Sequence, residues 1–166
     1  MNFKFATGFD IHKLVSGRKL KLCGIEIPFE KGLLGHSDGD VGLHALIDAM
    51  LSASGLPDIG TLFPDNDPQY KDVESIKLLE KTLKLLDEKG FKVFQVDLTF
   101  ICDEPKLSPF YQKMKNLLSK KLKIDSSNIG IKARTTEGLM KVLKIDFIAC
   151  FCLVVLTRKE NFTVNS

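Results

Sequence analysis

The sequence has neither a long apolar run nor a strong excess of one charge. No window reaches the roughly 20 consecutive apolar residues that a membrane-spanning helix needs, and the first residues do not form a secretory signal. The net charge of +3 comes from dispersed lysines, which argues against a nucleic-acid surface but suits a small phosphorylated substrate. We therefore expect a cytoplasmic protein with neither a membrane nor a nucleic-acid partner.

The sequence also lacks a C-x-x-C pair. Its four cysteines lie in segments that read as strands: Cys23, Cys102, Cys150 and Cys152. This placement favours reduced thiols in the core over a disulfide framework or a zinc knuckle.

No internal repeat, low-complexity tract or linker interrupts the 166 residues. We expect one domain over residues 1–158 and a loose C-terminal tail over residues 159–166. The periodicity predicts an α+β fold, with helices packed on one face of a mainly antiparallel or mixed sheet. The first expected strand, 3–7, ends at Thr7-Gly8 and leads into an extended segment, 9–12. Further strands are expected as two pieces of 19–28 broken at Gly24, then at 91–102, at 129–134 and at 145–156, the last of them buried on both faces. The expected helices start near Asp38, Val73 and Ser108.

Histidine is the scarcest potential metal ligand, with only three residues in the chain. Asp10 and His12 are two apart on a predicted strand and therefore share a face. His44 lies on a predicted helix, with Asp48 one turn later. Each pair taken alone also fits a solvated surface. Together, Asp10, His12 and His44 would supply one carboxylate and two imidazoles and leave a coordination position open, as in catalytic zinc sites; manganese or cobalt could substitute.

Two further polar segments each allow two interpretations. Residues 56–68 are dense in proline and aspartate, which predicts a shaped loop and no helix. That loop is either a connector or a holder of a polyhydroxy or phosphate ligand. Thr135-Thr136-Glu137 stands at a predicted strand-to-helix junction, where it either caps the helix or helps to bind phosphate.

Six motifs, taken in order, resemble the 2-C-methyl-D-erythritol 2,4-cyclodiphosphate synthase family. They are Gly8-Phe9-Asp10-Ile11-His12, Gly35-His36-Ser37-Asp38-Gly39-Asp40 with His44, Asp58-Ile59-Gly60, Leu62-Phe63-Pro64-Asp65, Pro105-Lys106 and Thr135-Thr136-Glu137. Each motif alone is weak, but the ordered set, spanning residues 5–138, is specific.

The resemblance implies a lyase of the non-mevalonate (MEP) pathway of isoprenoid biosynthesis. Such an enzyme converts 4-diphosphocytidyl-2-C-methyl-D-erythritol 2-phosphate to 2-C-methyl-D-erythritol 2,4-cyclodiphosphate and releases CMP. The resemblance also implies a homotrimer, with the sheets at its core and the active sites between protomers. A eukaryotic member would work in a plastid-like organelle, although no transit peptide is visible in this chain.

The resemblance further implies a role for each matching residue. Asp10, His12 and His44 would bind zinc, the first two also touching substrate, and Glu137 would bind a second ion, magnesium or manganese. His36 and Thr135 would stabilise the transition state. The remaining expected substrate contacts are Ser37 at the 2-phosphate; Asp48, at the diol or supporting the metal; Asp58, Ile59 and Gly60 at the erythritol; Phe63, Pro64, Asp65, Asn66 and Asp67 enclosing the substrate; and Cys102, Asp103, Glu104, Pro105, Lys106, Leu107, Ser108, Arg134 and Thr136 at the cytidine diphosphate.

Residues 139–147 depart from the family pattern. Where the family carries a glycine- and arginine-rich motif, this chain has Leu-Met-Lys-Val-Leu-Lys-Ile-Asp-Phe. Lys141 and Lys144 stand at the positions of the usual aromatic residue and arginine, and a lysine lacks the flat fork of a guanidinium. Whether these two lysines contact an anion, and whether the family's isoprenoid-diphosphate site on the trimer axis is kept, is left open.

Two other functions are compatible with the same residues. A metal-dependent phosphohydrolase would use water as its nucleophile and would need a general base near the open position. A non-catalytic module that recognises cytidine nucleotides would use the metal only to hold its fold.

Overall fold

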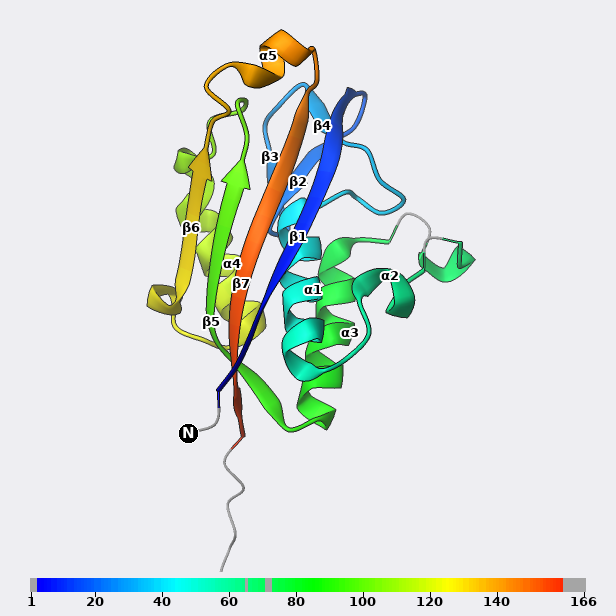
Figure 1. Cartoon of the computed structure of the whole chain (residues 1–166), viewed down its shortest axis with the longest axis vertical. Coiled ribbons are helices and arrows are strands. Elements are labelled where there is room, and N and C mark those ends of the chain that lie inside the picture. Colours follow the sequence, from blue (N-terminus) through cyan, green and yellow to red (C-terminus); the bar gives the residue numbers. More distant parts are fainter. Residues whose placement is uncertain (1–2, 65, 71–72, 160–166) are drawn as a thin grey trace, which may run out of the picture.

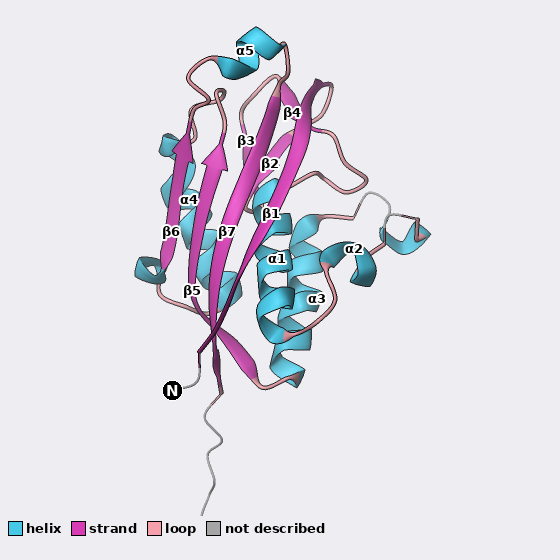
Figure 2. Ribbon diagram, viewed as in Figure 1, coloured by secondary structure: helices cyan, strands magenta, loops and turns pink. Residues whose placement is uncertain are grey.

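A five-stranded mixed sheet forms one layer of the molecule, in the order β4-β1-β7-β5-β6 (Figures 1 and 2). The computed structural model describes residues 3–64, 66–70 and 73–159. All neighbours in the sheet are antiparallel except β5 and β6, which are parallel. The strands are β1 (Phe3–Ser16), β4 (Lys31–Leu33), β5 (Phe91–Ile101), β6 (Ile129–Arg134) and β7 (Phe147–Arg158). The two short pieces predicted around Gly24 form a separate hairpin, β2 (Leu20–Leu22) with β3 (Ile25–Ile27).

The three long helices pack on one face of this sheet, as the sequence predicted (Figure 2). They are α1 (Val41–Ser54), α3 (Ser75–Glu88) and α4 (Tyr111–Leu122). Two short helices, α2 (Ile59–Leu62) and α5 (Leu139–Leu143), lie beside α1 and beyond the ends of β6 and β7 respectively (Figure 1). Short 3-10 turns occupy Pro68–Tyr70, Ser108–Phe110 and Ser126–Asn128. Within the described ranges, no helix has the length and apolar composition needed to cross a membrane.

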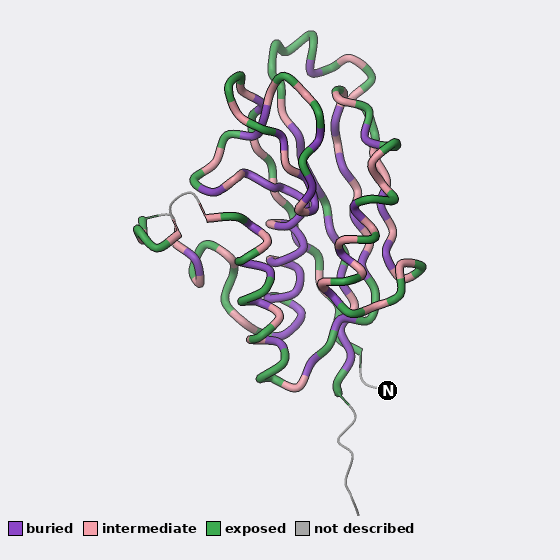
Figure 3. The backbone as a smooth tube through the Cα atoms, turned by 180° about the vertical axis from the view of Figure 1, so that it is seen from behind, coloured by how far each residue is buried: buried purple, intermediate pink, exposed green. Residues whose placement is uncertain are grey.

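Helix α1 is at the centre of the core, between β1 and β7 on one side and α3 on the other (Figure 3). Its apolar stripe, Leu43, Leu46, Ile47, Met50 and Leu51, is fully buried. Residues three and four apart share one face of a helix, so this stripe packs against the sheet as a unit. The four cysteines are buried free thiols, as predicted.

The opposite face of the sheet is apolar and bare in the single chain. Strand β7 was predicted to be buried on both faces, and this is wrong for one chain: Cys150 and Cys152 are buried, but Phe151 and Leu153 are 48% and 41% exposed. Side chains alternate across a strand, so only every second residue meets the helices. The exposed apolar face comprises Phe3, Phe5, Phe9, Ile11, Phe94, Phe151 and Leu153.

Strand β1 does not end at Thr7-Gly8, contrary to the prediction, but runs on to Ser16. Gly8 is fully paired with Cys152 of β7. A Cβ atom at Gly8 would lie 2.1 Å from the carbonyl oxygen of Ala45. The glycine therefore allows α1 to approach the strand closely and does not mark a break.

Two helix starts also differ from the prediction. Helix α1 begins at Val41, and Asp40, not a residue near Asp38, is its N-cap, accepting the Leu43 N–H. Ser108 opens a 3-10 turn, and α4 begins only at Tyr111. In both places several residues with capping side chains or a proline precede the helix, so sequence alone does not single out the true start.

The proline- and aspartate-rich segment 56–68 contains helix α2, which the sequence did not predict. Asp58 caps it by accepting the Thr61 N–H at 2.8 Å. Pro57 and Pro64 flank the turn and keep it short. Of the predicted tail, residues 160–166 lie outside the described residues, so the tail stays a prediction.

A candidate metal centre in the cleft beside helix α1

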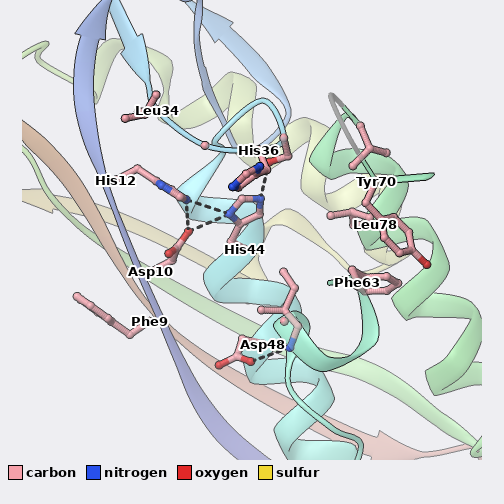
Figure 4. Close-up of a pocket in the computed structure, with 15 residues that line it drawn as sticks. Phe9, Asp10, His12, Leu34, His36, His44, Asp48, Phe63, Tyr70 and Leu78 are labelled. Carbon is pink, nitrogen blue, oxygen red and sulfur yellow. Dashed lines mark hydrogen bonds and ion pairs between the residues drawn. The ribbon is translucent and has the colours of Figure 1, made fainter. Parts of the chain in front are cut away.

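A cleft of about 650 Å³ opens between β1, the loop before α1, and helices α1 and α2 (Figure 4). The loop before α1 gives it His36 and Ser37. Many residues that the sequence analysis assigned to the metal, phosphate or erythritol lie in its wall: Asp10, His12, His36, Ser37, His44, Asp48, Ile59, Gly60 and Phe63.

Asp10, His12 and His44 converge at one end of this cleft and point toward one another (Figure 4). Asp10 Oδ2 lies 3.0 Å from His12 Nε2 and 2.9 Å from His44 Nδ1. The two imidazole nitrogens are 3.4 Å apart. The predicted convergence of a strand pair with a helical histidine is therefore present in the structure.

The fold explains this convergence. Asp10 and His12 are on the helix-covered face of β1, because they alternate with the exposed Phe9 and Ile11. Helix α1 passes directly over this strand at Gly8, which faces the carbonyl of Ala45, the residue after His44. The fully buried Asp40 anchors the start of the helix by accepting the N–H groups of Cys23, Gly24 and Leu43.

The three donor atoms fit a zinc ion. Zinc bound at its usual 2.0–2.1 Å in tetrahedral geometry keeps its ligands roughly 3.3 Å apart. The separations here, 2.9 to 3.4 Å, match that edge length. One carboxylate and two imidazoles fill three positions, and the cleft leaves room for a fourth ligand.

The same contacts shift the pKa values of the cluster. Burial opposes ionisation of Asp10, but hydrogen bonds and charge from His12 and His44 outweigh it and lower the pKa of the carboxyl well below its usual range. Burial alone would lower the pKa of His44, but its hydrogen bond to Asp10 and the charge of that carboxylate raise it. A cation in place of the proton between these groups would meet the same negative charge.

Ser75 is a site residue that the sequence analysis missed. It is the first residue of α3, is fully buried, and its Oγ lies 2.8 Å from Nε2 of His44. No motif in the sequence marks it, because its partner is 31 residues away and only the packing of α3 on α1 brings them together.

The loop that carries His36 and Ser37 is held from outside the cleft. Arg18 donates through Nη2 to the Ser37 carbonyl at 2.7 Å, and the Ser37 hydroxyl accepts the Gly39 N–H. His36 is exposed at the cleft. The His36 side chain can therefore meet an anion that enters from solvent, whereas Ser37 lines the cleft but is buried.

The residues expected at the erythritol and those expected to enclose the substrate divide into two groups. Asp48 accepts the Ile59 N–H through Oδ1 at 3.3 Å, and Gly60 and Phe63 also line the cleft. Pro64, Asn66 and Asp67 follow but do not line it, and Asp65 lies outside the described residues.

A second cluster, built from the expected cytidine-diphosphate residues, lies at the end of β5 and β6. Asp103 accepts the Thr136 N–H at 2.6 Å and the Thr136 hydroxyl at 2.7 Å. The Thr135 hydroxyl donates to Glu137 at 2.7 Å. Thr136 Oγ1 also accepts the Met140 N–H. Thr136 therefore supports the first turn of α5, although the N-cap position of that helix is Gly138. These contacts link the 102–108 loop with residues 134–137.

The structure does not bring this second cluster to the metal cluster within one chain. Ile11 pairs with Ala149, Ala149 with Ile101, and Ile101 with Arg134, so all four lie in one row across the sheet. The row crosses three strand spacings, or about 14 Å. The candidate site thus has two halves at the same level of the sheet.

Within the part of the chain that the structure describes, the side chains of Lys141 and Lys144 make no hydrogen bond or ion pair; their backbones are joined by a hydrogen bond from the Lys144 N–H to the Lys141 carbonyl. Both are exposed on α5 and at its C-terminal end. They lie away from the main cleft, and their proposed anion contact stays a prediction.

An α+β sheet domain with an open three-ligand centre is typical of a metal-dependent enzyme. Residues 3–157 match the YgbB family, and the chain belongs to this family. Relatives from Caldicellulosiruptor bescii and Clostridioides difficile are named 2-C-methyl-D-erythritol 2,4-cyclodiphosphate synthase, which confirms the resemblance predicted from the motifs.

Individual relatives match over nearly their whole length. The protein of Caldicellulosiruptor bescii is 50% identical over 154 residues, covering 93% of this chain and 98% of the relative. That of Clostridioides difficile is 46% identical, covering 95% and 99%. Among solved structures, a cyclodiphosphate synthase with bound CDP has a TM-score of 0.86 at 39% identity, covering 93% of this chain and all of the other. A Plasmodium falciparum CDP complex has a TM-score of 0.82 at 33% identity, covering 96% and 98%.

Proposed function

We propose that this enzyme cyclises 4-diphosphocytidyl-2-C-methyl-D-erythritol 2-phosphate to 2-C-methyl-D-erythritol 2,4-cyclodiphosphate with release of CMP. It is then a phosphorus-oxygen lyase of the non-mevalonate pathway. The observation that carries the proposal is the convergence of Asp10, His12 and His44 beside an open cleft in a chain of this family.

The reaction needs no protein nucleophile. An oxygen of the substrate's 2-phosphate forms a bond to the β-phosphorus, and the anhydride bond to the α-phosphate breaks, so that CMP leaves with the electron pair. The substrate is a flexible polyanion, so the enzyme must fold it, balance its charge and align the attacking and leaving oxygens. Positioning groups are therefore expected to supply most of the rate.

Each half of the site supports one part of that task. Asp10, His12 and His44 would hold zinc, or manganese or cobalt, which when bound polarises the β-phosphate. His36 and Ser37 would hold the 2-phosphate. Asp58, Ile59 and Gly60 with Asp48 would hold the erythritol hydroxyls.

The cluster at the end of β5 and β6 would hold the nucleotide half. Thr135 would donate to the transferred phosphate, and Glu137 would hold a second divalent ion, magnesium or manganese, which would balance the charge of the diphosphate. Residues 102–108 with Arg134 and Thr136 would surround the cytidine. The CDP-bound relatives of similar fold support a nucleotide half.

We infer that the two halves meet between protomers of a homotrimer. The metal cluster on β1 and the second cluster at the end of β6 are separated across the strands of one sheet. The exposed apolar face of β1, β5 and β7 needs a partner. Sedimentation velocity should give the mass of three chains. Phe5→Lys, at a residue 74% exposed on that face, should dissociate the assembly, whereas Lys84→Glu on the helix side should not; a monomeric wild type would refute the inference.

Phosphorus NMR of the product tests the activity. Incubation of the substrate with the enzyme, zinc and magnesium should give the cyclic diphosphate and CMP. Linear phosphates in place of the cyclic product would instead support a phosphohydrolase. Binding without turnover would support a nucleotide-binding module. Cell fractionation of the source organism would test the predicted cytoplasmic location.

A further inference from the structure

The second ring nitrogen of His44 faces two serine hydroxyls. Its Nε2 lies 2.8 Å from Ser75 Oγ and 3.1 Å from Ser37 Oγ. The other nitrogen, Nδ1, faces Asp10 and His12. The hydrogen-bonding state of Nε2 therefore decides whether Nδ1 offers a lone pair to a metal, because a neutral imidazole carries one hydrogen on one of its nitrogens.

The direction of the hydrogen bond between His44 and Ser75 follows from Asp38. The Ser75 hydroxyl has a single hydrogen, and it donates to Asp38 Oδ1 at 2.5 Å. The Ser75 N–H donates to the same oxygen at 3.2 Å. An ionised carboxylate can only accept. Ser75 Oγ is therefore left as an acceptor toward His44, and the hydrogen of the imidazole stays on Nε2.

Asp38 is itself held in place from the far side. Lys21 Nζ lies 3.7 Å from Asp38 Oδ2 and 2.8 Å from Glu74. Ser75 is fully buried, and Asp38 is largely covered. The chain of contacts from Lys21 through Asp38 and Ser75 to His44 runs from the surface to the metal cluster.

We propose that Asp38 and Ser75 are positioning residues of the metal centre, which fix the tautomer and ring orientation of His44. The proposal rests on the proposed function only in taking His44 as a metal ligand. Partners that hold a ligating histidine in this way typically contribute 10- to 100-fold to metal affinity. Neither residue would bind the metal itself: Ser75 contacts the ligand His44, and Asp38 contacts Ser75.

Asp38 also has a structural role, which the test must separate. Glu74, the N-cap of α3, makes no side-chain cap, and Asp38 accepts the first N–H of that helix instead. Loss of this cap alone would lower stability without changing the electronic state of His44. Metal affinity and metal spectra therefore distinguish the two roles, whereas thermal unfolding does not.

The experiment measures zinc affinity of the full chain by competition with a chromophoric chelator, and the visible absorption of the cobalt-substituted protein. The variants are Ser75→Ala, Asp38→Ala and the double variant. Ser54→Ala is the matched control, because Ser54 is a buried serine on α1 whose hydroxyl, among the described residues, bonds only to the Leu51 carbonyl.

Ser75→Ala should bind zinc about 10- to 100-fold more weakly and shift the cobalt bands. Asp38→Ala should have a similar effect although it does not contact His44, because the freed Ser75 hydroxyl can donate to Nε2 and place the hydrogen on Nδ1. The double variant should lose no more than Ser75→Ala alone, since both substitutions act through one hydroxyl. Ser54→Ala should keep the wild-type affinity and spectrum.

Unchanged zinc affinity and cobalt spectrum in Ser75→Ala would overturn the proposal, and this variant decides alone if Asp38→Ala does not fold. Additive losses in the double variant would also overturn it. Failure of the proposed function gives a different pattern: His44→Ala would then bind zinc as the wild type does, or the wild type would form no cyclic product.

Discussion

Replacing Gly8 with alanine should damage both the fold and the metal cluster. The new Cβ would lie 2.1 Å from the Ala45 carbonyl oxygen and 2.7 Å from the Ala49 nitrogen, whereas ordinary contact begins at 3.4 Å. Both obstacles are helix backbone, which cannot rotate away. Helix α1 and strand β1 must therefore separate by on the order of 1 Å.

The size of the effect follows from this geometry. Overpacking a core typically costs 1–3 kcal/mol, and a backbone clash of this depth belongs at the upper end, about 3 kcal/mol. For a chain of this length that corresponds to a fall in Tm of roughly 6–12 °C. Separation also moves His44 away from Asp10 and His12, so zinc affinity should fall with stability.

Gly130→Ala is the matched control, because it too lies in a strand of the same sheet. Its Cβ would meet the Asp97 side chain at 2.2 Å, but that side chain is flexible and partly exposed. Its movement disturbs only the Lys132–Asp97 ion pair, worth about 0–1 kcal/mol. Thermal unfolding at fixed protein and zinc concentrations should separate the two variants. Equal Tm values for them would refute the close-approach argument for Gly8.

Three other predictions address the site. Asp10→Ala, His12→Ala and His44→Ala should each abolish cyclisation with little change in circular dichroism; global unfolding of all three would contradict a catalytic role. Thr135→Ala should lower kcat more than it raises KM, because the expected contact strengthens in the transition state; equal loss of both would argue for simple binding. In metal-free protein, the pKa of His44 is raised from 6.5 and that of Asp10 lowered from 3.8. The ion pair of Asp10 and His44 therefore stabilises the fold most at pH values between the two pKa values. Its contribution declines as pH rises through the pKa of His44 or falls through that of Asp10, so the Tm of chelator-treated protein should drop from pH 6 to pH 9. A Tm that does not change over this range would exclude a stabilising ion pair.

The sequence predicted those parts of the fold that depend on local periodicity. The alternation in β5 and the buried stripe of α1 both appear where the residues indicated them. The convergence of Asp10 and His12 also followed, because residues two apart on a strand must share a face. Features that depend on the spacing of neighbouring residues could therefore be predicted from the sequence.

Features that depend on tertiary packing were not visible in the same way. Gly8 was interpreted as the end of a strand, because the sequence does not distinguish a glycine that ends a strand from one that allows a helix to pack closely. Asp40 and Asp38 both looked like caps of one helix, but Asp40 caps α1 and Asp38 serves α3. Ser75 carried no signal because its partner His44 belongs to another helix. Strand β7 looked doubly buried because a surface that other chains could cover is as apolar as a core.

Asp10 on β1 and Thr135 after β6 are separated across the strands of one sheet, and this separation has a consequence for mixtures of inactive variants. If each working centre takes one half from each of two neighbouring chains, two inactive proteins, one altered at each half, can complement each other. Random co-assembly of equal amounts would leave about a quarter of the centres with both intact halves. Catalytic activity would then reappear when two preparations, each inactive by itself, are mixed.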